Sequence, residues 1–166
     1  MPMKISKIEK LDQRCAILAQ IVTRLRRLYA GSQKTQKDLL ETIIGAAIWY
    51  LPECDGLFTG EMSRKAVELC RSNRKNWAKL SKEHRYPRKR AGRDLLKSRA
   101  KLSESWIRSK YQKKWGRYNR VTKEENRKLV AFQKKNLSPK KCYGKCGIVL
   151  ITKPAGIGPR TVRNPH

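Results

Sequence analysis

Acidic residues are scarce in this chain of 166 residues. It has 13 Asp and Glu residues against 41 Lys and Arg residues, which gives a formal net charge of +28. An excess of this size repels itself in a compact state unless a polyanion neutralises it. The excess is concentrated in residues 71–141, where 26 basic residues stand against 5 acidic ones, a net charge of +21. We therefore expect this segment to bind nucleic acid.

Long apolar runs and a secretory signal are also missing. The longest apolar stretch, residues 43–51, is too short to cross a membrane. The chain has five cysteines, an odd number that does not suit a complete set of disulfides. Together these features predict an intracellular, cytoplasmic protein with reduced thiols and no membrane partner.

Histidine is rarer still, with only His84 and His166. Histidines matter here because they could complete a zinc site with Cys142 and Cys146, the only cysteines close together in the sequence. Structural zinc sites usually need two such pairs, or a pair with histidines. The remaining cysteines would have to supply ligands from a distance, so we expect ordinary thiols and no structural zinc. Those cysteines are Cys15, Cys54 and Cys70.

Apolar residues are present at helical spacing in the first half of the chain. A heptad pattern, spaced alternately by three and four, predicts one long helix that ends at Gly31. A mostly apolar helix over residues 35–51 and a shorter one over residues 60–71 should follow. The heptad seam has two possible uses, an intramolecular hairpin with the second helix or pairing with a second subunit to form a homodimer. The seam consists of Ile8, Leu11, Cys15, Leu18, Val22, Leu25 and Tyr29.

The basic segment is interleaved with aromatic and aliphatic residues, unlike a disordered tail. Its pattern predicts a helix over residues 90–110 and a short strand over residues 118–121. Thr122 and Glu125 have the spacing of a capping box, which predicts a helix that continues to about residue 136. A closing strand over residues 147–151 and a flexible tail over residues 153–166 complete the prediction. We expect an α+β, predominantly helical fold, with a helical region at 1–75 and a nucleic-acid-binding unit at 76–152.

The segment from Glu83 to Asn126 resembles the HNH, or ββα-metal, endonucleases. In that family the first motif often reads Asp/Glu-His-x-x-Pro, and residues 83–87 here read EHRYP. Asn119 in RYNRVT matches the middle asparagine, and Asn126 in KEENRKL matches the position where many members carry a second histidine. The chain therefore resembles a His-Asn-Asn variant. The 35 residues between His84 and Asn119 exceed the compact form of the family, and a helix inserted over residues 90–110 would account for the difference.

The resemblance implies a metal-dependent DNA endonuclease of homing, mobile-element or restriction type. His84 would be the general base, since a histidine accepts a proton from water near neutral pH. Glu83 and Asn126 would supply hard oxygen ligands to Mg²⁺ or Mn²⁺, and Asn119 would fix the loop or orient His84. We expect seven basic residues to contact phosphates: Arg85, Arg88, Lys89, Arg90, Arg93, Arg117 and Arg120.

Simpler readings remain open for each of these residues. Glu83 and His84 also suit a surface ion pair, and Asn119 and Asn126 suit a turn and a solvated helix position. Glu124 or Glu125 could replace Asn126 as the metal ligand. The alternative function is a non-catalytic, ribosome-associated or architectural nucleic-acid-binding protein, for which RNA is as suitable a partner as DNA. Only the nuclease requires His84 and a divalent metal.

Overall fold

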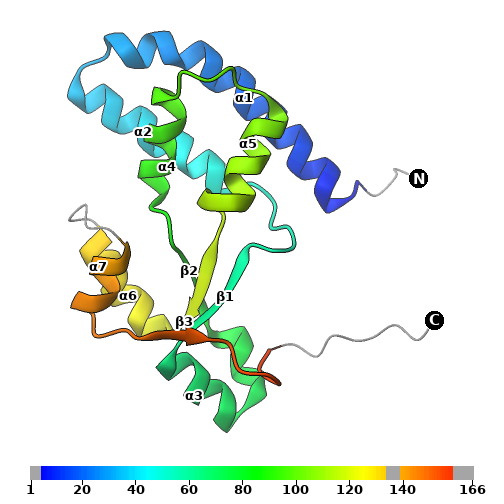
Figure 1. Cartoon of the computed structure of the whole chain (residues 1–166). Coiled ribbons are helices and arrows are strands. Elements are labelled where there is room, and N and C mark those ends of the chain that lie inside the picture. Colours follow the sequence, from blue (N-terminus) through cyan, green and yellow to red (C-terminus); the bar gives the residue numbers. More distant parts are fainter. Residues whose placement is uncertain (1–4, 134–138, 159–166) are drawn as a thin grey trace. The chain divides into compact units, whose positions relative to one another are not determined.

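The computed structural model describes residues 5–133 and 139–158. The fold is α+β, as predicted, with a mixed sheet of four strands. The chain divides into two compact units, each built from two separate segments (Figure 1). Of the described residues, the helical unit contains 5–57 and 84–117, and the sheet unit contains 58–83, 118–133 and 139–158.

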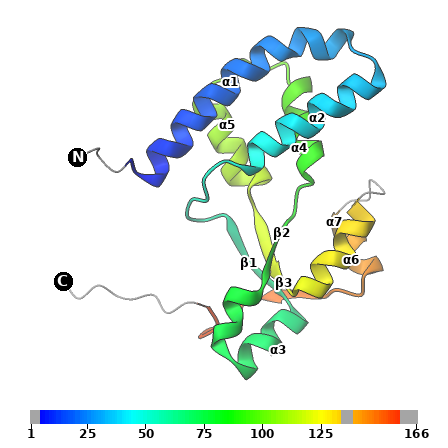
Figure 2. The ribbon, with the colours of Figure 1, turned by 180° about the vertical axis from the view of Figure 1, so that it is seen from behind.

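The helical unit begins with two long helices, α1 (Lys7–Gly31) and α2 (Lys34–Trp49). Figures 1 and 2 show them as an antiparallel hairpin. Helix α1 starts at a capping box, in which Ser6 and Glu9 exchange hydrogen bonds of 2.8 and 3.2 Å. The unit is completed by α4 (Arg88–Lys97), α5 (Glu104–Lys110) and a π-helical turn (Tyr111–Trp115), and α4 packs along α2.

The heptad seam of α1 is used inside this unit. Five of its residues are buried, whereas Ile8 is 62% exposed at the start of the helix. The buried face of α1 packs mainly against α5, with smaller contacts to α4 and α2. The seam therefore stabilises the chain's own core, and pairing with a second subunit is not supported by it. The five buried residues are Leu11, Cys15, Leu18, Val22 and Tyr29.

The sheet unit has the strand order β2-β3-β1-β4. Strand β1 (Phe58–Ser63) pairs parallel to β3 (Tyr118–Val121) and antiparallel to β4 (Leu150–Thr152). Strand β2 (Ser81–His84) lies next to β3, and its last residue belongs to the helical unit. The predicted strand at 118–121 is confirmed by β3.

Four helical segments surround these strands. Helix α3 (Arg64–Ser72) and a 3₁₀ helix (Arg74–Lys79) join β1 to β2. Helices α6 (Lys123–Gln133) and α7 (Pro139–Lys145) follow β3 and precede β4 in the sequence, and they pack on each other (Figure 2). The capping box at the start of α6 is confirmed, because the Thr122 and Glu125 backbone N–H groups donate to each other's side chains.

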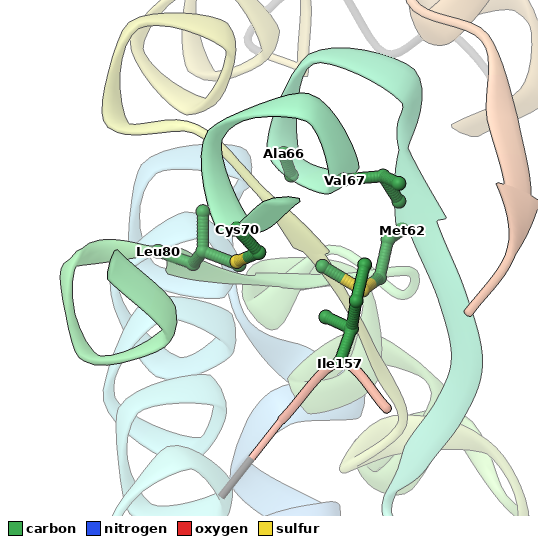
Figure 3. Close-up of a cluster of buried hydrophobic side chains, with 6 residues drawn as sticks. All are labelled: Met62, Ala66, Val67, Cys70, Leu80 and Ile157. Carbon is green, nitrogen blue, oxygen red and sulfur yellow. The ribbon is translucent and has the colours of Figure 1, made fainter. Parts of the chain in front are cut away.

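One core of the sheet unit is formed by β1, α3 and the chain beyond β4. Met62 from β1 and Ile157 meet beneath the inner side of α3 (Figure 3). Ile157 is only 8% exposed, so the chain is packed at a position that we expected to belong to a flexible tail. Residues 159–166 of that tail lie outside the described residues. The cluster consists of Met62, Ala66, Val67, Cys70, Leu80 and Ile157.

Three predicted elements differ from the observed ones. The expected helix over residues 60–71 begins only at Arg64, because residues 58–63 form β1, where Gly60 has a φ of 86°. The expected helix over 90–110 is two helices, with residues 98–103 between α4 and α5. The closing strand lies at 150–152 and not at 147–151. In the last case a turn precedes the strand, and Gly147 within it has a φ of 64°.

Candidate functional site

The candidate site residues lie on two neighbouring strands of the sheet and on the helix that follows the second strand. Glu83 is on β2, Asn119 is on β3, and Asn126 is in the first turns of α6. All three belong to the sheet unit, whereas His84, the residue after Glu83, belongs to the helical unit. The structure thus places the candidates on a strand, the neighbouring strand and the helix that follows it.

Glu83 and Asn119 are joined through a tyrosine. The Tyr143 hydroxyl of α7 donates to the Glu83 carboxylate and accepts a hydrogen bond of 2.9 Å from Asn119 Nδ2. Asn119 Oδ1 in turn accepts a 2.5 Å hydrogen bond from the Thr59 hydroxyl of β1. Glu83 is 3% exposed and Asn119 is 0% exposed. We call Thr59, Asn119, Tyr143 and Glu83 the buried polar chain.

The buried polar chain explains why an acid and an amide sit in the interior of the sheet unit. Burial of a polar group is costly unless a hydrogen bond replaces the water it loses. Each of these residues donates a hydrogen bond to the next or accepts one from it, and the buried polar chain thereby connects β1, β3, α7 and β2. Tyr143 was not among the predicted site residues. The segment CYGKC drew attention only through its cysteines, and no local pattern marks its tyrosine as a partner of Glu83.

Replacement of Tyr143 by Phe should destabilise the sheet unit. The change keeps the ring and removes the hydroxyl that joins Glu83 to Asn119, both of which are buried. Loss of a buried hydrogen-bond partner typically costs about 1–3 kcal/mol. Urea unfolding followed by circular dichroism would measure the loss. Tyr50→Phe is the matched control because Tyr50 is 75% exposed, and an equal stability change in both variants would contradict this role for Tyr143.

His84 has an aromatic neighbour within the helical unit. Its ring centroid lies 4.6 Å from that of Trp49, with the planes tilted by 47°. The Arg88 guanidinium lies over the same indole, 4.3 Å from its centroid. Trp49 is itself 43% exposed. The imidazole therefore packs against an indole while remaining only half-buried.

The first turn of α6 offers one amide and two acids. Asn126 is half-buried, and its backbone N–H donates to the Thr122 carbonyl at 3.0 Å. Glu125 is buried and accepts from the Ser63 hydroxyl at 2.5 Å as well as from the Thr122 N–H at 2.9 Å. Glu124 pairs with Lys128 at 2.9 Å, and the hydrogen bond from Lys128 lowers the pKa of Glu124. Both acids have structural partners, which leaves Asn126 as the best candidate ligand on this helix.

The seven predicted phosphate contacts differ in their surroundings. Lys89 pairs with Asp38, and Arg93 pairs with Glu41 at 2.9 Å. Burial alone would raise the pKa of Glu41, but hydrogen bonds from Arg93 and Tyr29 outweigh it and lower the pKa. Lys89 and Arg93 therefore have carboxylate partners inside the protein.

The other five basic residues lie just after β2 (Arg85), on α4 (Arg88 and Arg90), just before β3 (Arg117) and on β3 (Arg120). Arg85, Arg88 and Arg90 are exposed, whereas Arg117 and Arg120 are half-buried. In the sheet unit, Arg120 lies over two rings, 5.0 Å from the Trp77 centroid and 5.5 Å from that of Tyr118. In the helical unit, the exposed Arg90 lies 5.5 Å from the Tyr86 centroid. Exposed arginines near aromatic rings are typical of surfaces that bind nucleic acid.

The cysteines and acids near the site do not form a metal cluster. Within residues 5–133 and 139–158, no group of three His, Cys, Asp or Glu side chains is placed to hold an ion. Burial raises the pKa of both the Cys142 and Cys146 thiols, which opposes the thiolate form that zinc requires. Mg²⁺ differs, because it often binds through one or two carboxylates together with substrate phosphates and water. Glu83, whose carboxylate Tyr143 orients, and Asn126 provide oxygens of the right kind.

The chain matches no protein-family model, no curated protein and no solved structure. Among the described residues, no helix is long and apolar enough to cross a membrane.

Proposed function

We propose that this chain is a metal-dependent endonuclease of HNH type that hydrolyses DNA phosphodiester bonds. The observation that supports it best is the order of the elements that carry the candidate residues. Strand β2 ends at His84 and lies next to β3, which carries Asn119, and α6 follows β3 directly and carries Asn126. Two strands followed by a helix, with a histidine at the end of the first strand, is the arrangement that the resemblance implies.

The residues would divide the chemistry as follows. His84 would take a proton from the attacking water, since its imidazole is only half-buried. Glu83 and Asn126 would hold the divalent ion, which supplies positive charge to the phosphate when it is bound. Asn119 and Tyr143 would keep the Glu83 carboxylate in place through the buried polar chain. Arg85 and Arg88 would hold the flanking phosphates.

The charge of the chain favours a nucleic-acid substrate over any other phosphodiester. The net charge of +21 in residues 71–141 is far larger than a small substrate could neutralise. A duplex carries about one charge per 1.7 Å of its axis, so it supplies the matching polyanion.

A non-catalytic nucleic-acid-binding protein is the second candidate. The buried polar chain favours it, because Glu83 and Asn119 have a structural use that needs no metal. The same exposed arginines would then bind a nucleic acid without cutting it. Activity and its dependence on metal separate the two candidates.

Purified protein should convert supercoiled plasmid to nicked or linear DNA in the presence of Mg²⁺ or Mn²⁺. A chelator should abolish the conversion, because the phosphate then lacks the positive charge of the ion. Agarose electrophoresis over time measures both. Binding of the plasmid without any cleavage, under every metal condition, would favour the second candidate.

A further inference from the structure

An open cavity of about 660 Å³ lies in the helical unit, where residues of α1, α2 and α4 line it. Ligand sites in proteins usually have volumes of about 300–1,000 Å³. This cavity is lined by five basic side chains and two acidic ones. The basic ones are Arg26, Lys34, Lys37, Arg93 and Lys97.

The two acids of the cavity are already paired. Asp38 pairs with Lys89, and Glu41 pairs with Arg93 at 2.9 Å and accepts a hydrogen bond of 2.7 Å from Tyr29. Within the described part of the chain, no carboxylate forms an ion pair with the four remaining cations. The lining therefore carries uncompensated positive charge from Arg26, Lys34, Lys37 and Lys97.

Arg26 shows where an anion would be most effective. Its Nη1 donates to the Ala100 carbonyl at 2.9 Å, while its enclosed Nε and Nη2 have no acceptor among the described residues. These two nitrogens form the edge that a guanidinium uses for two parallel hydrogen bonds to an oxyanion. A guanidinium stays protonated in proteins, so burial does not remove its need for acceptors. Because the protein encloses this edge, an oxyanion in the open cavity reaches it only when the Arg26 side chain turns toward the cavity.

We propose that this cavity binds the phosphate group of a nucleotide or of a nucleic-acid backbone. Phosphate presents several acceptor oxygens around one centre, and flexible lysines bind it as point charges while an arginine binds it through its edge. The volume leaves space for more than the phosphate itself, which suits a phosphate ester. This binding does not depend on the proposed cleavage, because no residue assigned to catalysis lines the cavity.

Two variants of the whole protein test the proposal. Arg26→Gln removes the guanidinium, and the triple variant Lys34→Gln, Lys37→Gln, Lys97→Gln removes the lysines without changing the Arg26 contact to Ala100. The matched control, Lys7→Gln, Lys10→Gln, Arg27→Gln, removes three exposed charges of α1 that do not line the cavity. Circular dichroism first establishes that each variant is folded. Isothermal titration calorimetry then measures affinity for inorganic phosphate, a nucleoside monophosphate and a short duplex.

For a nucleotide site, we expect the wild type to bind the monophosphate with one site and the triple variant to bind it about tenfold more weakly, as loss of charged hydrogen bonds predicts. The control should keep the wild-type affinity. For a backbone site, only the duplex binds, and the triple variant weakens it more than the control does. Equal effects of the triple variant and the control on every ligand would overturn the proposal, as would binding of none of the three. If Arg26→Gln unfolds, the triple variant still decides the result.

Discussion

His84→Ala is expected to lower DNA cleavage by about 100-fold or more while DNA binding stays close to that of the wild type. A positioned general base usually contributes a factor of about 100 to 10,000 in rate, and alanine cannot accept the proton. A neutral imidazole adds little to phosphate affinity, so binding should depend on the arginines instead. Plasmid cleavage under single-turnover conditions measures the rate, and fluorescence anisotropy in the presence of chelator measures binding.

The packing of His84 on Trp49 calls for a specific control. The two rings lie 4.6 Å apart, so the alanine variant also loses a contact within the helical unit. Trp49→Ala removes the same contact and keeps the imidazole. We expect the Trp49 variant to retain most of the cleavage that the His84 variant loses. Full cleavage by His84→Ala would show that this residue is not the base, and the non-catalytic candidate would then account better for the basic surface.

The elements that could be predicted are those whose structure depends on residues close to each other in the sequence. The heptad pattern of α1 predicts which face of the helix is apolar, and that face is buried in the structure. The Thr122 and Glu125 pair needs only a spacing of three residues, and its hydrogen bonds begin α6 at the expected place. Both signals act within one or two turns of a helix, where sequence separation and spatial distance are nearly equivalent.

Strand β1 could not be predicted because its partners are distant in the sequence. Its parallel neighbour β3 starts 60 residues later, with Phe58 opposite Tyr118. Residues 60–63 look compatible with the helix that follows them, and only pairing on both sides makes them a strand. The same long-range pairing makes both compact units discontinuous in the sequence. The predicted division of the chain at residue 75 describes two continuous segments, and it stays a prediction.

For the candidate site, the sequence names residues but not their surroundings. The motif EHRYP identified Glu83 and His84, yet nothing nearby indicates that Glu83 is buried and bonded to Tyr143. That hydrogen bond joins residues 60 positions apart. The carboxylate partners of Lys89 and Arg93 are similarly distant, on α2. Charge and motif therefore identify a basic segment, whereas tertiary contacts decide which of its charges pair with carboxylates inside the protein.

Gly92→Ala should have the largest effect on stability, because it acts where α2 and α4 approach most closely. A Cβ atom at Gly92 would lie 2.2 Å from the Glu41 carbonyl oxygen and 2.7 Å from the Gly45 nitrogen, both of them backbone atoms of α2. The opposite position, Gly45, is as crowded, with the Arg88 carbonyl oxygen 2.5 Å away. Backbone atoms cannot turn aside as a flexible side chain can, so the two helices would have to separate.

We expect Gly92→Ala to lower the free energy of unfolding by about 1–3 kcal/mol or more, the usual range for overpacking a core. Thermal and urea unfolding of the variant would measure the loss. Gly31→Ala is the matched control, since Gly31 ends α1 and nothing beyond its own stretch of helix lies within 4 Å of where a Cβ would be. Alanine in a helix gains roughly 0.5–1 kcal/mol over glycine, so the control should be neutral or more stable than the wild type. If Gly92→Ala were also neutral or stabilising, the two helices would lie further apart than the structure places them, and the cavity that they line would differ in shape.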